Sequence, residues 1–396
     1  MRQNREWDEE GEDEEASPSQ SVLSAFESLQ DPRRVKACCH TLEEILLGAL
    51  CAISSGANSW VMVETWCKFK LEWLRGHLPY ANGVPSHDTF SRVFNLLEPS
   101  QFEACFIAWM QQLCPSLKDQ QICIDGKTVR GSQDGPDVPP IHLVSAWAHA
   151  AGLVLGQIKT DVKSSEVTAI PELLDKLNVQ GALVTLDAVS CHRGIVRKIV
   201  QRQADYVVAV KGNQPSLEAA VQSMFGGKPA GAQGLQHTQR NKGHGRKETR
   251  CCTVVHELSA ITEALQGWTN VRSVVRVQST RELPATRHKP ASTSAEVRYY
   301  ISSLQLDAQE FSERIRAHWG IENSCHWVMD MTFSEDASRV RSGHGAQNIA
   351  LLRRISLNLI KRETSGKKTS LAVRRYRATL STDYLEIVLG MRAAPS

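Results

Sequence analysis

The sequence predicts an α/β protein in which an all-helical N-terminal region precedes a mixed sheet covered by helices, and three observations lead to this prediction. Residues 21–115 repeat apolar side chains three and four apart, the spacing of amphipathic helices. Residues 118–210 alternate short β-branched runs with helical patterns, as a partly parallel sheet requires. Two of these runs close on an aspartate, which would hold Asp125 and Asp187 at rigid strand positions.

Length and composition set the first limits. A chain of 396 residues with 41% hydrophobic content can bury a substantial core, and we expect two domains plus tails. No apolar run reaches the roughly 18–20 residues of a membrane span, and the charged start does not resemble a signal peptide, so we expect a cytoplasmic protein with no membrane partner. The eleven cysteines form no Cys-x-x-Cys pair, which favours reduced core thiols over zinc ligands.

The N-terminal third divides into a tail and a helical region. Residues 1–20 are acidic with almost no apolar content, so we expect them to be disordered. Helical periodicity then begins at Ser21. Within it, Ser86 is a candidate N-cap for a short amphipathic helix ending near Leu97. This helix is either the recognition element of a helix-turn-helix or an ordinary bundle helix, because length and capping do not distinguish the two.

The elements of the expected sheet follow in order. Strand patterns occupy 121–130, 141–149, 153–162, 182–187 and 205–210, with helices at about 166–177 and 192–202 between them. From 211 to about 298 the sequence is irregular, Gly-rich and basic, with strand-like runs at 251–256, 271–279 and 296–304. We interpret this segment as a β-rich insertion whose basic loops either close on DNA or are solvated turns.

A long helix is expected from about Asp307 through Asp330, and it carries Glu322. His318 and His326, eight residues apart, flank the glutamate. Oxygen ligands are favoured over these imidazoles for a metal, since the histidines can equally contact phosphate or satisfy the core.

The formal charge of +3 conceals an asymmetry along the chain. Residues 1–15 hold eight acids and two bases, so the remainder carries a net charge of +9. Residues 337–396 hold twelve bases against three acids. This basic segment is either a DNA-backbone contact surface or a solvated helix face.

Asp125, Asp187 and Glu322 together suggest a catalytic metal site. An aspartate at a strand end is often only a turn or cap residue, so the combination carries the inference. Carboxylates suit Mg²⁺ or Mn²⁺. Two such ions about 3.5–4 Å apart activate an attacking oxygen and stabilise a leaving one during phosphodiester cleavage or joining.

At these residues the chain resembles insertion-sequence transposases of the H-repeat-associated group, from about residue 22 to 362. The resemblance rests on Asp31–Arg33, Pro85–Phe90, Ile124–Gly131, His142–Trp147, Ala169–Leu174, Tyr206–Gln214 and His318–Asn323. It implies a DDE-type transposase on a ribonuclease-H-like fold, which uses two Mg²⁺ or Mn²⁺ ions to cleave and transfer DNA strands. The implied partners are insertion-sequence ends and target DNA, bound by a homo-oligomer.

The resemblance also implies boundaries and roles. A helical DDE-associated domain would span 21–117, the catalytic domain 118–362 with its insertion at about 211–298, and a basic tail 363–396. Asp125, Asp187 and Glu322 would be catalytic and metal-binding. Candidate DNA contacts are Lys127, Arg130, Lys211, Arg246, Arg316, His318, Arg339 and Arg341.

The sequence departs from the wider DDE pattern, which places Tyr and Arg before the glutamate and Lys after it; here Ile315, His318 and Met329 stand there. This departure concerns the residues that position DNA more than it concerns Glu322. Two rival functions stay open, a catalytically inactive DNA-binding protein and a nuclease without strand transfer.

Three further acids, Asp330, Glu335 and Asp336, compete for the role of Glu322. If the helix continues that far, Asp336 lies about 21 Å further along its axis and cannot share a metal site with Glu322. Glu335 and Asp336 are instead expected near a helix end, paired with Arg339. Glu322 is therefore the predicted third carboxylate.

Overall fold

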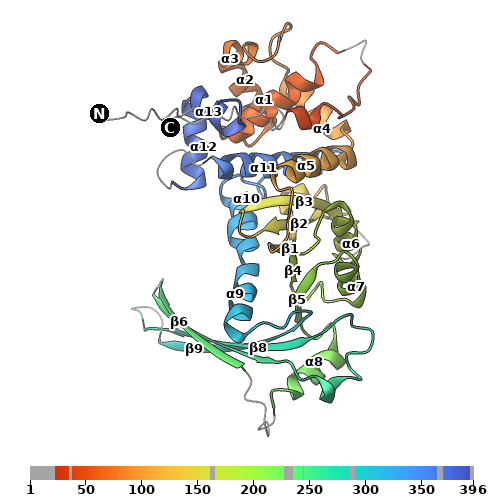
Figure 1. The fold of residues 1–396 in the computed structure, drawn as a ribbon. Coiled ribbons are helices and arrows are strands. Elements are labelled where there is room, and N and C mark those ends of the chain that lie inside the picture. The colour runs from red at the N-terminus through yellow and green to blue at the C-terminus, as the bar shows by residue number, and fades with distance from the viewer. Residues whose placement is uncertain are drawn as a thin grey trace, which may run out of the picture.

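The computed structural model describes residues 23–34, 38–160, 166–226, 235–243, 245–285, 290–363 and 369–392. The predicted disordered tail, 1–20, lies outside the described residues. Helices form the top of the molecule in Figure 1, the sheet and its covering helices form the middle, and a long β-ribbon forms the bottom. None of the described helices is both long enough and apolar enough to cross a membrane.

The N-terminal region is helical, as predicted. After a short 3-10 turn at Ser24–Phe26 come α1 (Leu42–Ser54), α2 (Trp60–Phe69), α3 (Leu71–Arg75), α4 (His87–Leu96) and α5 (Pro99–Leu113). Helix α4 begins where the sequence predicts, because the Ser86 side chain accepts a hydrogen bond from the Thr89 backbone N–H. Its apolar face, with Phe90, Val93 and Phe94, is buried among the other helices.

The central sheet has the predicted mixed topology. Strands β1 (Gln121–Thr128), β2 (His142–Ala148) and β3 (Leu153–Thr160) form an antiparallel meander, and β4 (Leu183–Leu186) and β5 (Asp205–Val210) run parallel to β1. Helices α6 (Glu166–Lys176) and α7 (Arg193–Gln201) cover one face, and α9 (Ala308–His318) covers the other (Figure 1). Parallel β1 and β4 present their carboxyl ends at the same edge of the sheet.

The insertion extends this sheet. Strands β6 (Leu235–Gly243), β7 (Arg246–Val255), β8 (Ser273–Leu283) and β9 (Ser292–Ser302) complete nine strands in the order β3-β2-β1-β4-β5-β9-β8-β7-β6. A helix, α8 (Pro215–Ser223), and a 3-10 turn, Ser259–Ile261, lie within it. The sequence prediction missed β6, because this outermost strand is largely exposed and lacks an apolar alternation.

The basic segment 337–396, predicted to be either a DNA-contact surface or a solvated helix face, is largely packed into the fold. Helix α11 (Gly345–Arg362) is a core helix, and Arg353 and Arg354 on it are only 1% and 0% exposed. Residues beyond it form α12 (Leu371–Leu380) and α13 (Thr382–Leu389), which pack against α1 and α11. Some of these basic side chains form hydrogen bonds inside the protein: Arg375 donates to the backbone carbonyls of Ile53 and Ala57. The number of bases in the sequence is therefore larger than the number that face solvent.

All eleven cysteines are free, and most are buried, as the sequence predicts.

A buried acid between α5 and α11 gives the fold a pH dependence. Glu103 is 4% exposed and accepts a hydrogen bond from Gln347 Nε2 at 2.7 Å. Burial raises the pKa of Glu103 from 4.5 to about 7. Between these values the unfolded chain has already lost the proton that the folded chain keeps, so stability falls as pH rises through this window.

Glu103→Gln should remove this fall and leave the variant more stable than wild type above pH 7, by about 2–3 kcal/mol. Urea unfolding of both proteins at about pH 5 and pH 8 measures the difference. Parallel pH profiles for the two proteins would contradict the prediction.

Candidate catalytic metal site

Two strands bring the first two acids together at one edge of the sheet. The parallel ladder between β1 and β4 pairs Ile124 with Leu186, so Asp125, the next residue of β1, and Asp187, the first residue after β4, are neighbours at its end. Asp125 lies opposite Ser145 of β2, and its side chain is 23% exposed. The hydrophobic runs that precede both acids are buried, which makes these positions rigid.

The third acid comes from the helix that crosses this edge. A capping box between Asp307 and Glu310 starts α9. The sequence predicts one regular helix to Asp330, but the helix changes to a π-helical turn at Glu322–His326 before α10 (Trp327–Met331). Such wide turns inside helices are frequent at functional sites.

The π-helical turn directs Glu322 and His326 at Asp125. His326 Nδ1 lies 3.1 Å from Glu322 Oε2 and 3.4 Å from Asp125 Oδ2. Ligand atoms of these three residues all lie within 4.8 Å of one another, so they could share one cation. Among the described residues, Asp187 lies beside this group, but its carboxylate oxygens are not all within 4.8 Å of the other three ligand atoms.

The electrostatics indicate an excess of negative charge. Burial is the main cause that raises the pKa of Asp125 to about 6; His326 acts against this, and the Asp187 carboxylate adds to it. Burial also raises the pKa of Asp187. The hydrogen bond from His326 lowers that of Glu322. A divalent cation would relieve this repulsion, and the carboxylate donors fit Mg²⁺ or Mn²⁺.

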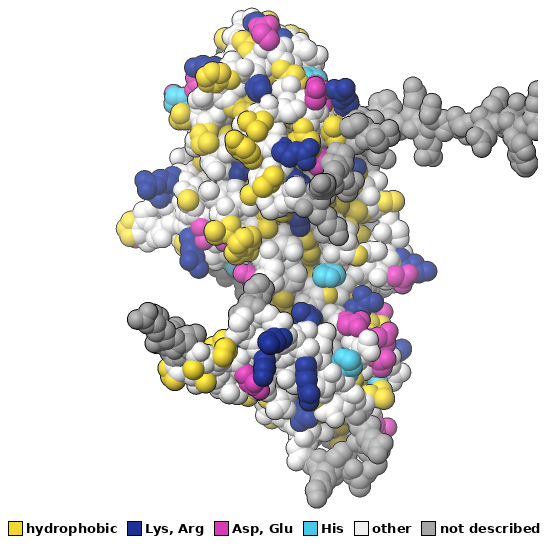
Figure 2. Space-filling view, turned by 90° about the vertical axis from the view of Figure 1, so that its left-hand side faces the viewer, with side chains coloured by type: hydrophobic (Ala, Val, Ile, Leu, Met, Phe, Trp, Pro, Cys, Tyr) yellow, Lys and Arg dark blue, Asp and Glu magenta, His cyan; other side chains and the backbone are white. Residues whose placement is uncertain are grey.

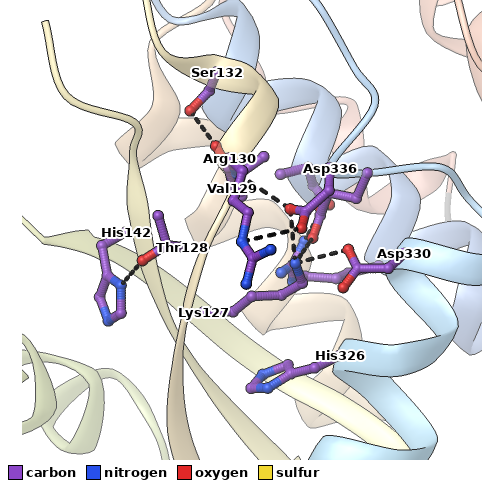
Figure 3. Close-up of polar contacts among 12 residues, drawn as sticks. Lys127, Thr128, Val129, Arg130, Ser132, His142, His326, Asp330 and Asp336 are labelled. Carbon is purple, nitrogen blue, oxygen red and sulfur yellow. Dashed lines mark hydrogen bonds and ion pairs between the residues drawn. The ribbon is translucent and has the colours of Figure 1, made fainter.

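Lys127, predicted as a DNA contact, is instead buried and paired with acids of this chain. Its side chain is 8% exposed, and Nζ lies 2.8 Å from Asp330 Oδ1 and 3.1 Å from Asp336 Oδ1 (Figure 3). The same carboxylate of Asp336 accepts the backbone N–H of Arg130. The helix ends at Met331 and the chain turns back, so these ion pairs tie the end of β1 to the segment after Glu322.

The expected pairing of Glu335 and Asp336 with Arg339 is also wrong. Glu335 is fully buried, and its Oε1 lies 2.7 Å from Arg354 Nη1. Asp336 pairs with Lys127 instead. Both acids are held by partners that the sequence places far away, so neither is free to replace Glu322.

The other candidate DNA contacts differ in exposure. His318 is 8% exposed and hydrogen-bonded to Thr185 Oγ1, and burial lowers its pKa to about 4, so its prediction as a DNA contact is wrong. Arg246 is half-buried on β7. The exposed members are Arg130, Lys211, Arg316, Arg339 and Arg341.

Two clefts lie between α9 and the insertion. One of about 500 Å³ is lined by Arg250, Arg281, Arg298, Arg316 and Trp319, and the Arg298 guanidinium lies 4.7 Å from the centre of the Trp319 ring. The other, about 300 Å³, runs beside Asp187 and Lys211. An arginine-rich surface therefore borders the acidic edge, although Glu248 pairs with Arg250 and Arg281, and Glu296 pairs with Arg298.

Two residues of the site were not predicted from the sequence. His326 was noted, but oxygen ligands were favoured over it, and only the π-helical turn shows that it lies between two acids. Glu166, the first residue of α6, approaches the same edge of the sheet from the opposite face. No sequence pattern marked it as more than a helix start.

Comparison with known proteins places the whole chain in context. Residues 23–110 match a family described as DDE_Tnp_1-associated, and residues 116–359 match one described as a transposase DDE domain. The chain is 39% identical to a putative transposase, YncI, of Escherichia coli O157:H7, over 93% of this chain and 94% of the relative. It is 37% identical to the H repeat-associated putative transposase YhhI of Escherichia coli K12, over 93% and 97%.

Among solved structures, the chain is similar to a piggyBac transposase synaptic complex with hairpin DNA. The TM-score is 0.41 at 12% identity, covering 96% of this chain and 79% of that one. The family matches and the nine-stranded mixed sheet confirm the predicted fold class, a ribonuclease-H-like sheet with a β-rich insertion after a helical region.

Proposed function

Because this chain belongs to the DDE transposase family, we propose that it binds the ends of an insertion sequence and catalyses Mg²⁺-dependent strand cleavage and strand transfer. The observation that supports the proposal is the cluster of Asp125, Glu322 and His326, whose ligand atoms lie within 4.8 Å of one another, with Asp187 beside it after the end of the neighbouring strand β4. Asp187 and Glu322 lie 62 and 197 positions after Asp125 in the chain, and the fold brings acidic side chains from these distant positions to the same place.

Each acid has a proposed part. Asp125 and Asp187 would hold the cations from the strand ends, and Glu322 would complete the site from the helix. Two bound Mg²⁺ ions would activate the attacking oxygen and stabilise the leaving oxygen of an in-line displacement. His326 holds the Glu322 carboxylate close to Asp125. Water attacks the phosphodiester first, and the freed 3′-hydroxyl of the element end attacks target DNA second.

The DNA would follow the basic surface next to this edge. Lys and Arg side chains are prominent over the insertion in the lower half of Figure 2. Proposed backbone contacts are Lys211 beside Asp187, Arg316 on α9, Arg246 on the insertion, and the exposed bases Arg130, Arg339 and Arg341. We propose a homo-oligomer on DNA, with each copy acting at an element end.

Binding should depend strongly on salt. Each neutralised phosphate contributes about −0.9 to the slope of log affinity against log salt. Replacing Lys211, Arg246 and Arg316 together by Ala should therefore flatten the slope by roughly two to three units. Fluorescence anisotropy with a labelled element end across a salt series measures this change.

The matched control is Arg75→Ala on α3, where the arginine pairs with Glu72 away from the sheet edge. It should leave the slope unchanged. An unchanged slope in the triple variant would show that these bases form a solvated surface.

The proposed reaction is tested with an oligonucleotide that carries one element end with a free 3′-hydroxyl, incubated with a target plasmid and Mg²⁺. Joined product supports the transposase. Cleavage without joining would indicate a nuclease, and binding without either would indicate an inactive DNA-binding protein. Footprinting on the DNA that flanks its own reading frame identifies the ends to use.

A further inference from the structure

Gly126, the residue after Asp125, leaves room for the side chains of Glu166 and His142 beside the backbone of β1. Its φ does not lie in the left-handed region, so the backbone itself does not require glycine. A Cβ added there would lie 2.1 Å from Glu166 Oε1 and 2.3 Å from His142 Nε2. Any side chain at this position would therefore displace Glu166 from the backbone of β1.

Both carboxylate oxygens of Glu166 already have partners. Oε1 lies 2.9 Å from His142 Nε2, and Oε2 accepts a hydrogen bond from Ser190 Oγ at 2.7 Å. The side chain is only 13% exposed. Although burial raises the pKa of Glu166, the bonds from His142 and Ser190 lower it below its usual value, so the carboxylate stays charged and its hydrogen bonds are strong.

Ser190 connects Glu166 to the second catalytic acid. Its backbone N–H donates to Asp187 Oδ1 at 3.1 Å, while its hydroxyl donates to Glu166. At the other end, His142 Nδ1 lies 2.9 Å from Thr128 Oγ1 of β1. A continuous chain of hydrogen bonds thus joins β1, β2, the start of α6 and the turn after β4.

Asp187 has no comparable support from the helix side. Glu322 is held by His326, and Asp125 lies within a paired strand, but Asp187 follows the last residue of β4 in a turn. The side chains of Asn213 and Gln214 donate to the carbonyls of Ala188 and Cys191 in that turn. The Ser190 bridge ties the turn to β1 and β2 through Glu166 and His142. Burial raises the pKa of Asp187, the hydrogen bonds from Ser190 lower it, and the nearby charge of Glu166 raises it.

We propose that Glu166 is a positioning residue for Asp187: through Ser190 it holds the turn after β4 against β1 and β2, and thereby sets the separation of Asp187 from Asp125. This inference rests on the proposed function, since it assumes that the two aspartates share a metal site. It concerns a carboxylate outside the Asp125, Asp187 and Glu322 set.

The test measures Mn²⁺ binding by calorimetry, with Mn²⁺ electron paramagnetic resonance as a second readout, on the full chain without DNA. Glu166→Ala and Ser190→Ala should each weaken Mn²⁺ binding about tenfold or more, as loss of an outer partner of a metal ligand does. Ser190→Ala keeps the backbone bond to Asp187 and removes the hydroxyl that bonds to Glu166 and also interacts with Asp187. Glu166→Gln still accepts from Ser190 and should bind within about threefold of wild type.

The control is Glu172→Ala, which removes an exposed acid from the same helix, where it pairs with Lys176. It should bind Mn²⁺ as wild type does. Thermal unfolding of every variant shows whether a loss comes from the site or from the fold.

Two results would overturn the proposal. If Glu166→Gln loses Mn²⁺ as fully as Glu166→Ala while Ser190→Ala is unaffected, Glu166 is a direct ligand and not a positioning residue. If Glu166→Ala and Ser190→Ala both bind normally, the hydrogen-bonded chain does not set the site.

Asp125→Asn separates this inference from the proposed function. Asp125→Asn should lose Mn²⁺ binding whether or not Glu166 matters. Normal Mn²⁺ binding by Asp125→Asn would remove the proposed metal site, and with it the role of Glu166. Loss in Asp125→Asn with no loss in Glu166→Ala would overturn only the inference about Glu166.

Discussion

Replacing Glu322 by Gln should abolish Mg²⁺-dependent DNA cleavage, by roughly 10³-fold or more, while DNA binding survives. Gln keeps the shape of the side chain and removes the charge that would hold a cation beside Asp125. His326, which lies 3.1 Å from the Glu322 carboxylate, still has an oxygen to contact in the variant, so the π-helical turn should persist. A cleavage assay on a labelled element end, with anisotropy for binding, measures both effects.

Asp336→Asn is the matched control, because Asp336 also lies near β1 but contacts Lys127 and the Arg130 backbone. It should cost some stability through the Lys127 ion pair and leave most of the cleavage activity. If the Asn variant loses cleavage and the Gln variant keeps it, the assignment of Glu322 is wrong and the acid after the helix is the catalytic one.

Replacing Arg354 by Met should destabilise the fold by about 3–5 kcal/mol, because it leaves the carboxylate of Glu335 buried without its closest partner. Both residues are 0% exposed, and their ion pair measures 2.7 Å. Lys127 Nζ, at 3.9 Å from Glu335 Oε2, is too far to take over the bond. Urea denaturation should show an earlier midpoint with an unchanged slope.

The double variant Glu335→Gln, Arg354→Met should recover part of the loss, since it removes both charges. Arg75→Ala, at an exposed ion pair, should change stability by less than about 1 kcal/mol. A wild-type midpoint for Arg354→Met would show that water reaches Glu335.

Much of the fold was predictable because local patterns carry it. The short apolar runs before Asp125 and Asp187 became parallel neighbours β1 and β4, and Ser86 caps α4 as its side chain requires. Helical periodicity also anticipated α9 and the delivery of Glu322 to the sheet. These features depend on residues close in sequence, whose periodicity and capping do not need the rest of the chain.

Three features were not predictable, each because it depends on distant partners. Strand β6 is exposed on one face and only half-buried on the other, so no apolar alternation marks it, and its pairing with β7 makes it a strand. In the sequence, Arg353 and Arg354 look like basic residues of a helix surface. Arg354 is buried because it pairs with Glu335, which lies nineteen residues away in the chain. The turn at Glu322–His326 looks like ordinary helix in the sequence.

By itself, the sequence therefore determined the order of the elements, the family and the three candidate acids, since these follow from periodicity and from motifs of a few residues. Only the tertiary structure decided which charges face solvent and which are buried in pairs, and which side chains surround the acids. His326 and Glu166 reach the site from a π-helical turn and from the opposite face of the sheet. The physical reason is that charge and hydrogen-bond partnership are properties of positions in space, and packing brings together residues whose separation along the chain carries no sign of the contact.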